Sequence, residues 1–305
     1  MTRISTVQRA RQSVDLITQR QSEISDLQRQ ISTGKRVLKP SDDPSAAAQA
    51  ERTRSEVARM EVESRMLGFA QLKLAQAESA VGEGNDLFQR ARELLIGAKN
   101  DSNSPADRAL YAKELSSIRD ALLNLSNRSD GLGGFVFGGA GTRQPPFVQG
   151  ANGIEYLADA GAQFTGSEST LTISVDGRNL FGTSSGAGVE SVFDMIDNAV
   201  RVMENTGAAA VDTHTSISDT IDGIDAAIDR FSSTRASLGE QMATADRAAA
   251  SLALGEELAA ERLSDLTGVD MAEAISAMSA KNTELDAAMQ TYVQISGLSL
   301  FNYIR

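Results

Sequence analysis

The stretch that decides the fold runs from Ile217 to Leu266 and reads ISDTIDGIDAAIDRFSSTRASLGEQMATADRAAASLALGEELAAERLSDL. Apolar side chains recur in it at alternating steps of four and three residues, as in Ile217, Ile221 and Ile224. This spacing places a continuous seam along one face of an α-helix. Fifty helical residues extend about 75 Å at 1.5 Å per residue. We therefore expect one long helix that packs against a partner of similar length.

Residues 43–99 offer that partner. Large side chains recur there every seven residues, and alanine or glycine fills the neighbouring row. The helix is expected to begin at Ser41-Asp42-Asp43-Pro44, because side-chain oxygens can accept first-turn amide protons and proline fits the first turn. The predicted fold class is mainly α: a long antiparallel coiled-coil helical rod with terminal helices and a small β-rich insert domain.

The β-rich outer insert domain is predicted at residues 130–188. Residues 129–188 hold 14 of the 25 glycines and five of the ten phenylalanines. Short apolar runs, such as residues 171–175, alternate with turn pairs such as Asn152-Gly153, which is typical of strands and turns. The helical rod domain then comprises residues 41–129 and 189–269.

Both ends of the chain carry apolar seams of their own, at residues 1–40 and 270–305. Because helices in proteins are stabilised mostly by packing of an apolar face, these terminal coiled-coil assembly segments must pair with each other or with other copies. Residues 1–41 carry eight basic and three acidic side chains, whereas residues 263–305 carry two basic and five acidic ones. These opposite charges suit pairing between the two ends. The predicted assembly seam consists of Val7, Val14, Ile17, Ile24, Ile31, Met271, Met278, Leu285, Tyr292 and Ile295.

Composition excludes several classes of function. The net charge of −12 disfavours nucleic-acid binding, since phosphate contacts come from lysine and arginine. The absence of cysteine excludes disulfides, thiolate-bound zinc, iron–sulfur clusters and a thiol nucleophile. No apolar stretch is long enough to cross a bilayer. Residues 1–30 lack the apolar block of a secretory signal, so we expect no cleaved signal peptide.

No chemical site emerges from the remaining motifs. His214, the single histidine, lies in a polar turn before a helix and is expected at the surface. The pair Asp42-Asp43 is better explained by helix capping than by catalysis. The glycine-rich run at residues 131–136 lacks the last glycine of a dinucleotide fingerprint and follows a helix instead of a strand. We therefore expect no enzyme, and no catalytic, cofactor-binding or metal-binding residue.

Two motifs resemble those of a known family. Residues 31–37 (ISTGKRV), followed by residues 41–47 (SDDPSAA), resemble the amino-terminal motif of the flagellin superfamily. Residues 272–304, which end in SLFNYI, are similar to its carboxy-terminal helix. Three features resemble the sequences of the hook-associated junction proteins more than those of flagellin. They are Pro44, the run Phe137-Gly138-Gly139 and the end of the chain.

The resemblance implies a structural subunit of the bacterial flagellum that forms the junction between hook and filament and assembles through its terminal helices. It implies an extracellular place in the flagellum, reached by type III export without a cleaved signal peptide. The implied partners are other copies in a ring, the neighbouring hook-associated junction protein, flagellin, and an export chaperone at the carboxy-terminal helix. Nucleic acid and membrane are not among them.

Two other functions also fit the sequence. Flagellin itself would have the same architecture in many copies, and copy number per flagellum would separate it from a junction subunit. A cytoplasmic coiled-coil scaffold or signalling protein would also use an antiparallel helical hairpin. That alternative predicts pairing of long rods between subunits and no export.

Overall fold

The computed structural model describes residues 6–131, 133–150, 153–158, 164–165, 171–184, 189–205 and 210–301. The chain divides into two compact units, one formed by residues 1–60 and 254–305 and the other by residues 61–253. The domain boundaries expected from the sequence stay a prediction. The helices are α1 (Thr6–Thr33), α2 (Pro44–Ala98), α3 (Pro105–Ser126), α4 (Gly177–Phe181), α5 (Val192–Glu204), α6 (Ala210–Thr267) and α7 (Met271–Phe301). The mainly α fold class is thereby confirmed.

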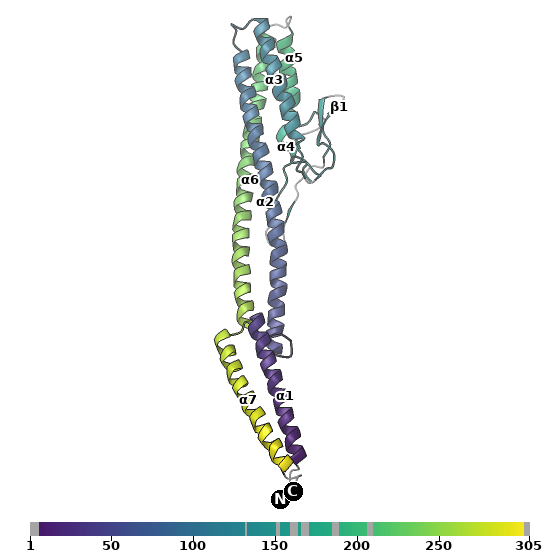
Figure 1. Cartoon of the computed structure of the whole chain (residues 1–305). Helices are drawn as coiled ribbons and strands as arrows, with labels where there is room; N and C mark the ends of the chain where they lie inside the picture. Colours follow the sequence, from purple (N-terminus) through teal and green to yellow (C-terminus); the bar gives the residue numbers. More distant parts are fainter. Residues whose placement is uncertain are drawn as a thin grey trace. The chain divides into compact units, whose positions relative to one another are not determined.

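In the second unit, the two long helices α2 and α6 run antiparallel and side by side (Figure 1). Arg92 on α2 bonds to Asp225 on α6 with an Nε–Oδ1 distance of 2.5 Å, and Gln71 donates to Asp246 at 2.8 Å. Residue numbers therefore rise along one helix as they fall along the other. Within this unit the expected seam of α6 is buried at Ile217, Ile224, Phe231, Leu238 and Ala245.

Two shorter helices, α3 and α5, pack against each other in this unit. A capping box starts α3: the Ser104 hydroxyl accepts the Asp107 amide proton at 3.2 Å, and the Asp107 carboxylate accepts the Ser104 amide proton at 3.1 Å. The apolar face of α3 is buried in the core shared by these helices, and its members are Ala112, Leu115, Ile118, Leu122 and Leu125.

The described residues of the insert contain two short antiparallel strand pairs. Strands β1 (Phe147–Gly150) and β2 (Gly153–Tyr156) form one antiparallel pair, with Phe147 opposite Tyr156. Strands β3 (Phe164–Thr165) and β4 (Leu171–Thr172) form another. Helix α4 follows, capped by the Asp176 carboxylate, which accepts the Arg178 amide proton at 2.9 Å.

Aromatic rings join the insert to the helices. Phe181 of α4 makes an edge-to-face contact with Phe231 of α6, with ring centroids 5.2 Å apart, and Phe231 meets Phe88 of α2 at 5.0 Å. Phe147 of β1 lies 5.8 Å from Phe193 of α5. All five side chains are buried. Insert and helices therefore share a single hydrophobic core.

A glycine allows close packing beside this aromatic cluster. A Cβ atom on Gly84 of α2 would lie 2.4 Å from the Phe231 ring and 3.2 Å from Leu125. Because overpacking strains a buried core, we expect Gly84→Ala to lower the free energy of unfolding by about 1–3 kcal/mol. The matched control is Gly239→Ala in α6, which has open space around it and should gain up to about 1 kcal/mol of helix propensity. Chemical denaturation of both variants measures this, and equal stabilisation of the two would contradict the packing argument.

Candidate assembly site at the terminal helices

In the first unit, α1 and α7 lie side by side (Figure 1). The contact face of α1 includes the buried side chain of Ile24, and that of α7 includes the buried Ala274. Half-buried residues at steps of three and four flank both. The terminal segments therefore pair within one chain, which is one of the two arrangements that their seams allowed.

The structure brings together most, but not all, of the seam residues expected from the sequence. Val14 and Met271 are exposed, at 45% and 44% of their full surface. The side chains of Val7 and Ile295 lie outside the described part of the structure. The remaining members are buried or half-buried on the two helices: Ile17, Ile24, Ile31, Met278, Leu285 and Tyr292.

Charged side chains that sequence reasoning missed contribute to the same pairing. Arg20 of α1 bonds to Glu284 of α7 at 2.8 Å, and Lys281 of α7 bonds to Glu23 of α1 at 2.9 Å. The hydrogen bond from Lys281 lowers the pKa of the Glu23 carboxyl, and Glu23 in turn raises the pKa of Lys281. Exposed pairs of this kind add little stability, so their main effect is to fix which residues face each other. The sequence feature that indicates these ion pairs is the contrast between the basic start and the acidic end of the chain.

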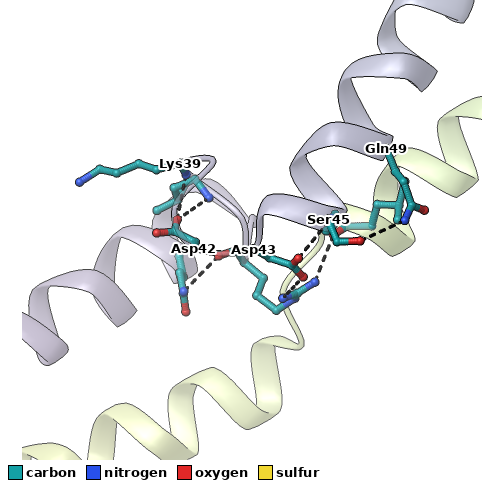
Figure 2. Close-up of polar contacts among 10 residues, drawn as sticks. Lys39, Asp42, Asp43, Ser45 and Gln49 are labelled. Atoms are coloured by element: carbon teal, nitrogen blue, oxygen red, sulfur yellow. Dashed lines mark hydrogen bonds and ion pairs between the residues drawn. The ribbon is translucent and has the colours of Figure 1, made fainter.

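A tight turn connects α1 to α2. Gly34 has a φ of +68°, a conformation that suits glycine at the end of a helix. The Asp42 carboxylate accepts the amide protons of Leu38 and Lys39 at 3.0 and 2.8 Å (Figure 2). The Asp43 carboxylate accepts the Ala46 amide proton at 2.9 Å and so caps α2.

The expected helix-start motif is thus a folded turn with separate tasks for its members. Pro44 is the first residue of α2, where its missing amide proton leaves no helical bond unmade. Ser41 is exposed beside the two aspartates. The two carboxylates therefore serve the backbone, and neither is directed at a substrate.

This turn is tied to the connection between α6 and α7. The Arg36 amide donates to the Thr267 carbonyl at 2.7 Å, and the Val269 amide donates to the Gly34 carbonyl at 3.2 Å. The Arg36 guanidinium also donates to the Leu266 carbonyl at 3.3 Å and contacts Asp43 at 3.4 Å. Each turn is evident in the sequence, but no sequence pattern indicates that the two bond to each other.

The carboxylates of the turn predict an acid-sensitive local structure. Backbone hydrogen bonds, from Lys39 to Asp42 and from Ala46 to Asp43, lower the pKa of both carboxyl groups below that of an ordinary aspartate. Groups with a lowered folded pKa stabilise the fold above their unfolded pKa and lose this effect as pH falls through the folded value. We expect Asp42→Ala to speed amide exchange at Lys39 at neutral pH, measured by NMR. Ser45→Ala serves as the control, and unchanged exchange in Asp42→Ala would contradict the assignment.

The paired terminal helices leave apolar side chains uncovered. On α1, Leu16 is 44% exposed, and on α7 the exposed fractions are 50% for Ile275, 40% for Met289 and 65% for Val293. A groove of about 340 Å³ runs between the two helices and is lined by Ser13, Leu16, Arg20, Glu284, Ala287, Ala288 and Thr291. Contiguous apolar surface on a monomer marks sites where another protein binds, and Leu16 places such surface in this groove.

The described residues offer little for other kinds of site. Within them, no group of three or more histidine, aspartate or glutamate side chains is arranged to hold a metal ion. None of the helices in the described part combines the length and apolar character needed to cross a membrane. His214 lies within α6 and not in a turn before a helix; it is half-buried, and its Nε2 lies 2.7 Å from Asp101 Oδ1 in the second unit.

Paired terminal helices joined to long antiparallel helices define a flagellin-like protein. The family model of the bacterial flagellin N-terminal helical region matches residues 4–142, and that of the C-terminal helical region matches residues 221–304. Flagellar hook-associated protein 3 of Salmonella typhimurium is 31% identical over 319 residues, covering 99% of this chain and all of the relative. The chain therefore belongs to the flagellar hook-associated protein 3 family.

Two further comparisons concern a flagellin and a solved structure. Flagellin of Bacillus subtilis is 27% identical over 263 residues, covering 85% of this chain and 84% of the relative. The crystal structure of the flagellar junction protein FlgL from Legionella pneumophila has the same fold, with a TM-score of 0.61 at 16% identity. It covers 72% of this chain and all of that protein.

Proposed function

We propose that this chain is a non-enzymatic structural subunit of the bacterial flagellum that forms the junction between hook and filament. Its family supports the place in the flagellum. The apolar side chains left uncovered on the paired helices α1 and α7 support assembly through the terminal segments. This uncovered surface is the single observation that carries the mechanism, since burying it releases free energy only when subunits meet.

The assembly seam is part of this proposal. Residues such as Leu285 and Tyr292 pair α7 with α1 inside one chain. Val14 and Met271, which are exposed in the single chain, would become buried against neighbouring subunits. Assembly then uses both sides of the terminal helices, one for pairing within the chain and one for contact with other copies.

The partners and the route of export are further parts of the proposal. We expect other copies in a ring, the neighbouring hook-associated junction protein on one side and flagellin on the other. Export would proceed through the flagellar type III channel without a cleaved signal peptide, and an export chaperone would cover the carboxy-terminal helix beforehand. The final location of the assembled subunit would be extracellular.

Immunolabelling of intact flagella tests the proposed function. A label confined to the boundary between hook and filament is the expected result. A label along the whole filament would instead identify the chain as flagellin, a possibility that the 27% identity to a flagellin keeps open. A label inside cells and absent from flagella would favour the scaffold alternative.

A further inference from the structure

Helix α2 carries an exposed apolar stripe inside the second unit. Val62, Met66 and Phe69 follow one another at steps of four and three residues and are 47%, 47% and 41% exposed. Leu72 extends the stripe and is 52% exposed, and the exposed Arg65 borders it. The opposite side of the same helix segment supplies buried core residues. We call these five residues the α2 stripe.

Helix α6 carries a second exposed apolar stripe inside the first unit. Leu254 and Leu258, one helical turn apart, are 58% and 52% exposed. Glu257, Glu261 and Asp265 surround them and are exposed as well. Arg262 is directed elsewhere, because it pairs with Glu56 of α2 at 3.5 Å. We call the two leucines and three carboxylates the α6 stripe.

The two stripes complement each other in chemistry. Each presents large apolar side chains. The exposed Arg59 and Arg65, with one carboxylate, Glu61, between them, border the α2 stripe, whereas carboxylates border the α6 stripe. Across the described residues, Arg65, Glu257, Glu261 and Asp265 make no ion pair. Complementary charge beside apolar surface favours a specific contact and disfavours wrong partners.

We propose that the α2 stripe of one copy docks on the α6 stripe of the next copy in the assembled flagellum. The inference rests on the proposed function, because it assumes that copies of the chain assemble side by side. A contact between the same stripe on two copies is disfavoured, since three carboxylates of one α6 stripe would face three of another. Contacts between two different patches are heterologous, and they close into rings or extend as helices. This geometry is the one that a junction layer needs.

Cross-linking can test the contact, because the chain contains no cysteine. Two differently tagged full-length variants, Arg65→Cys and Glu261→Cys, would be expressed together in the encoding bacterium lacking its own copy. Isolated flagella would then be treated with a short bis-maleimide cross-linker. We expect a cross-linked pair containing one of each tag, and no cross-linked pair of any kind in flagella built from either variant alone. Combining Gln89→Cys, an exposed residue of α2 far along the helix from the stripe, with Glu261→Cys gives the matched control.

Several outcomes would overturn the inference. Flagella that contain both variants without a mixed pair exclude the contact, and pairs formed by Arg65→Cys alone indicate a two-fold contact instead. If the cysteine variants do not enter flagella, charge-reversal variants test the contact instead. Arg65→Glu and Glu261→Arg should each reduce the number of attached filaments, and the double variant should restore it. Failure of the double variant to restore it counts against the contact. Absence of the unmodified chain from isolated flagella would instead contradict the proposed function itself.

Discussion

Replacing Phe231 with alanine is expected to lower the free energy of unfolding by about 3–5 kcal/mol, the cost typical of removing a fully buried aromatic ring. Phe231 has no exposed surface and touches both Phe88 of α2 and Phe181 of α4. Its removal leaves a cavity where two long helices and the insert meet. The loss should appear in urea or thermal denaturation followed by circular dichroism.

Leu110→Ala is the control for this change. Leu110 of α3 is 69% exposed, so the variant should shift stability by no more than about 0.5 kcal/mol. If Phe231→Ala were as stable as Leu110→Ala, the aromatic cluster would not be part of the folding core.

Leu285→Glu is expected to abolish swimming while leaving the second unit folded. Leu285 lies half-buried in the pairing of α7 with α1, so an added carboxylate loses apolar burial worth about 1–2 kcal/mol. Desolvation of the charge adds to this cost unless the group protonates. Because the defect recurs in every subunit, cells should carry hooks and release flagellin into the medium, as measured by immunoblotting of culture supernatants. The main melting transition of the purified protein should hardly change.

Asp286→Ala is the neighbouring control, because Asp286 is exposed beside the seam. Its cells should swim normally. Attached filaments and normal swimming in Leu285→Glu cells would show that the carboxy-terminal seam is not needed for assembly.

The long helices could be predicted from the sequence because heptad spacing persists over many turns. The seam from Ile217 onward and the helix start at Pro44 agree with the observed α6 and α2. Periodicity alone placed Val14 and Met271 in the terminal seam, yet both are exposed. Periodicity does not indicate where charged residues such as Arg20, which pairs with Glu284, share the face between the two helices.

The insert was harder to predict because its contacts are distant in sequence. Phe181 packs on Phe231 and Phe147 on Phe193, and both partners lie in helices outside the insert. No sequence pattern within the insert indicates that side chains of distant helices will pack against its phenylalanines. The same holds for the two turns, where Arg36 and Thr267 bond across more than two hundred residues.

The bonded turns have a mechanical consequence. Tension between the terminal helices and the long helices must pass through two covalent connections, residues 34–43 and 268–270. The backbone bonds between Arg36 and Thr267 and between Val269 and Gly34 clamp these connections to each other. Neither connection can then lengthen alone without breaking hydrogen bonds to the other. A pull or twist applied at α1 is therefore shared with α7. The two hydrogen-bonded connections carry the force together.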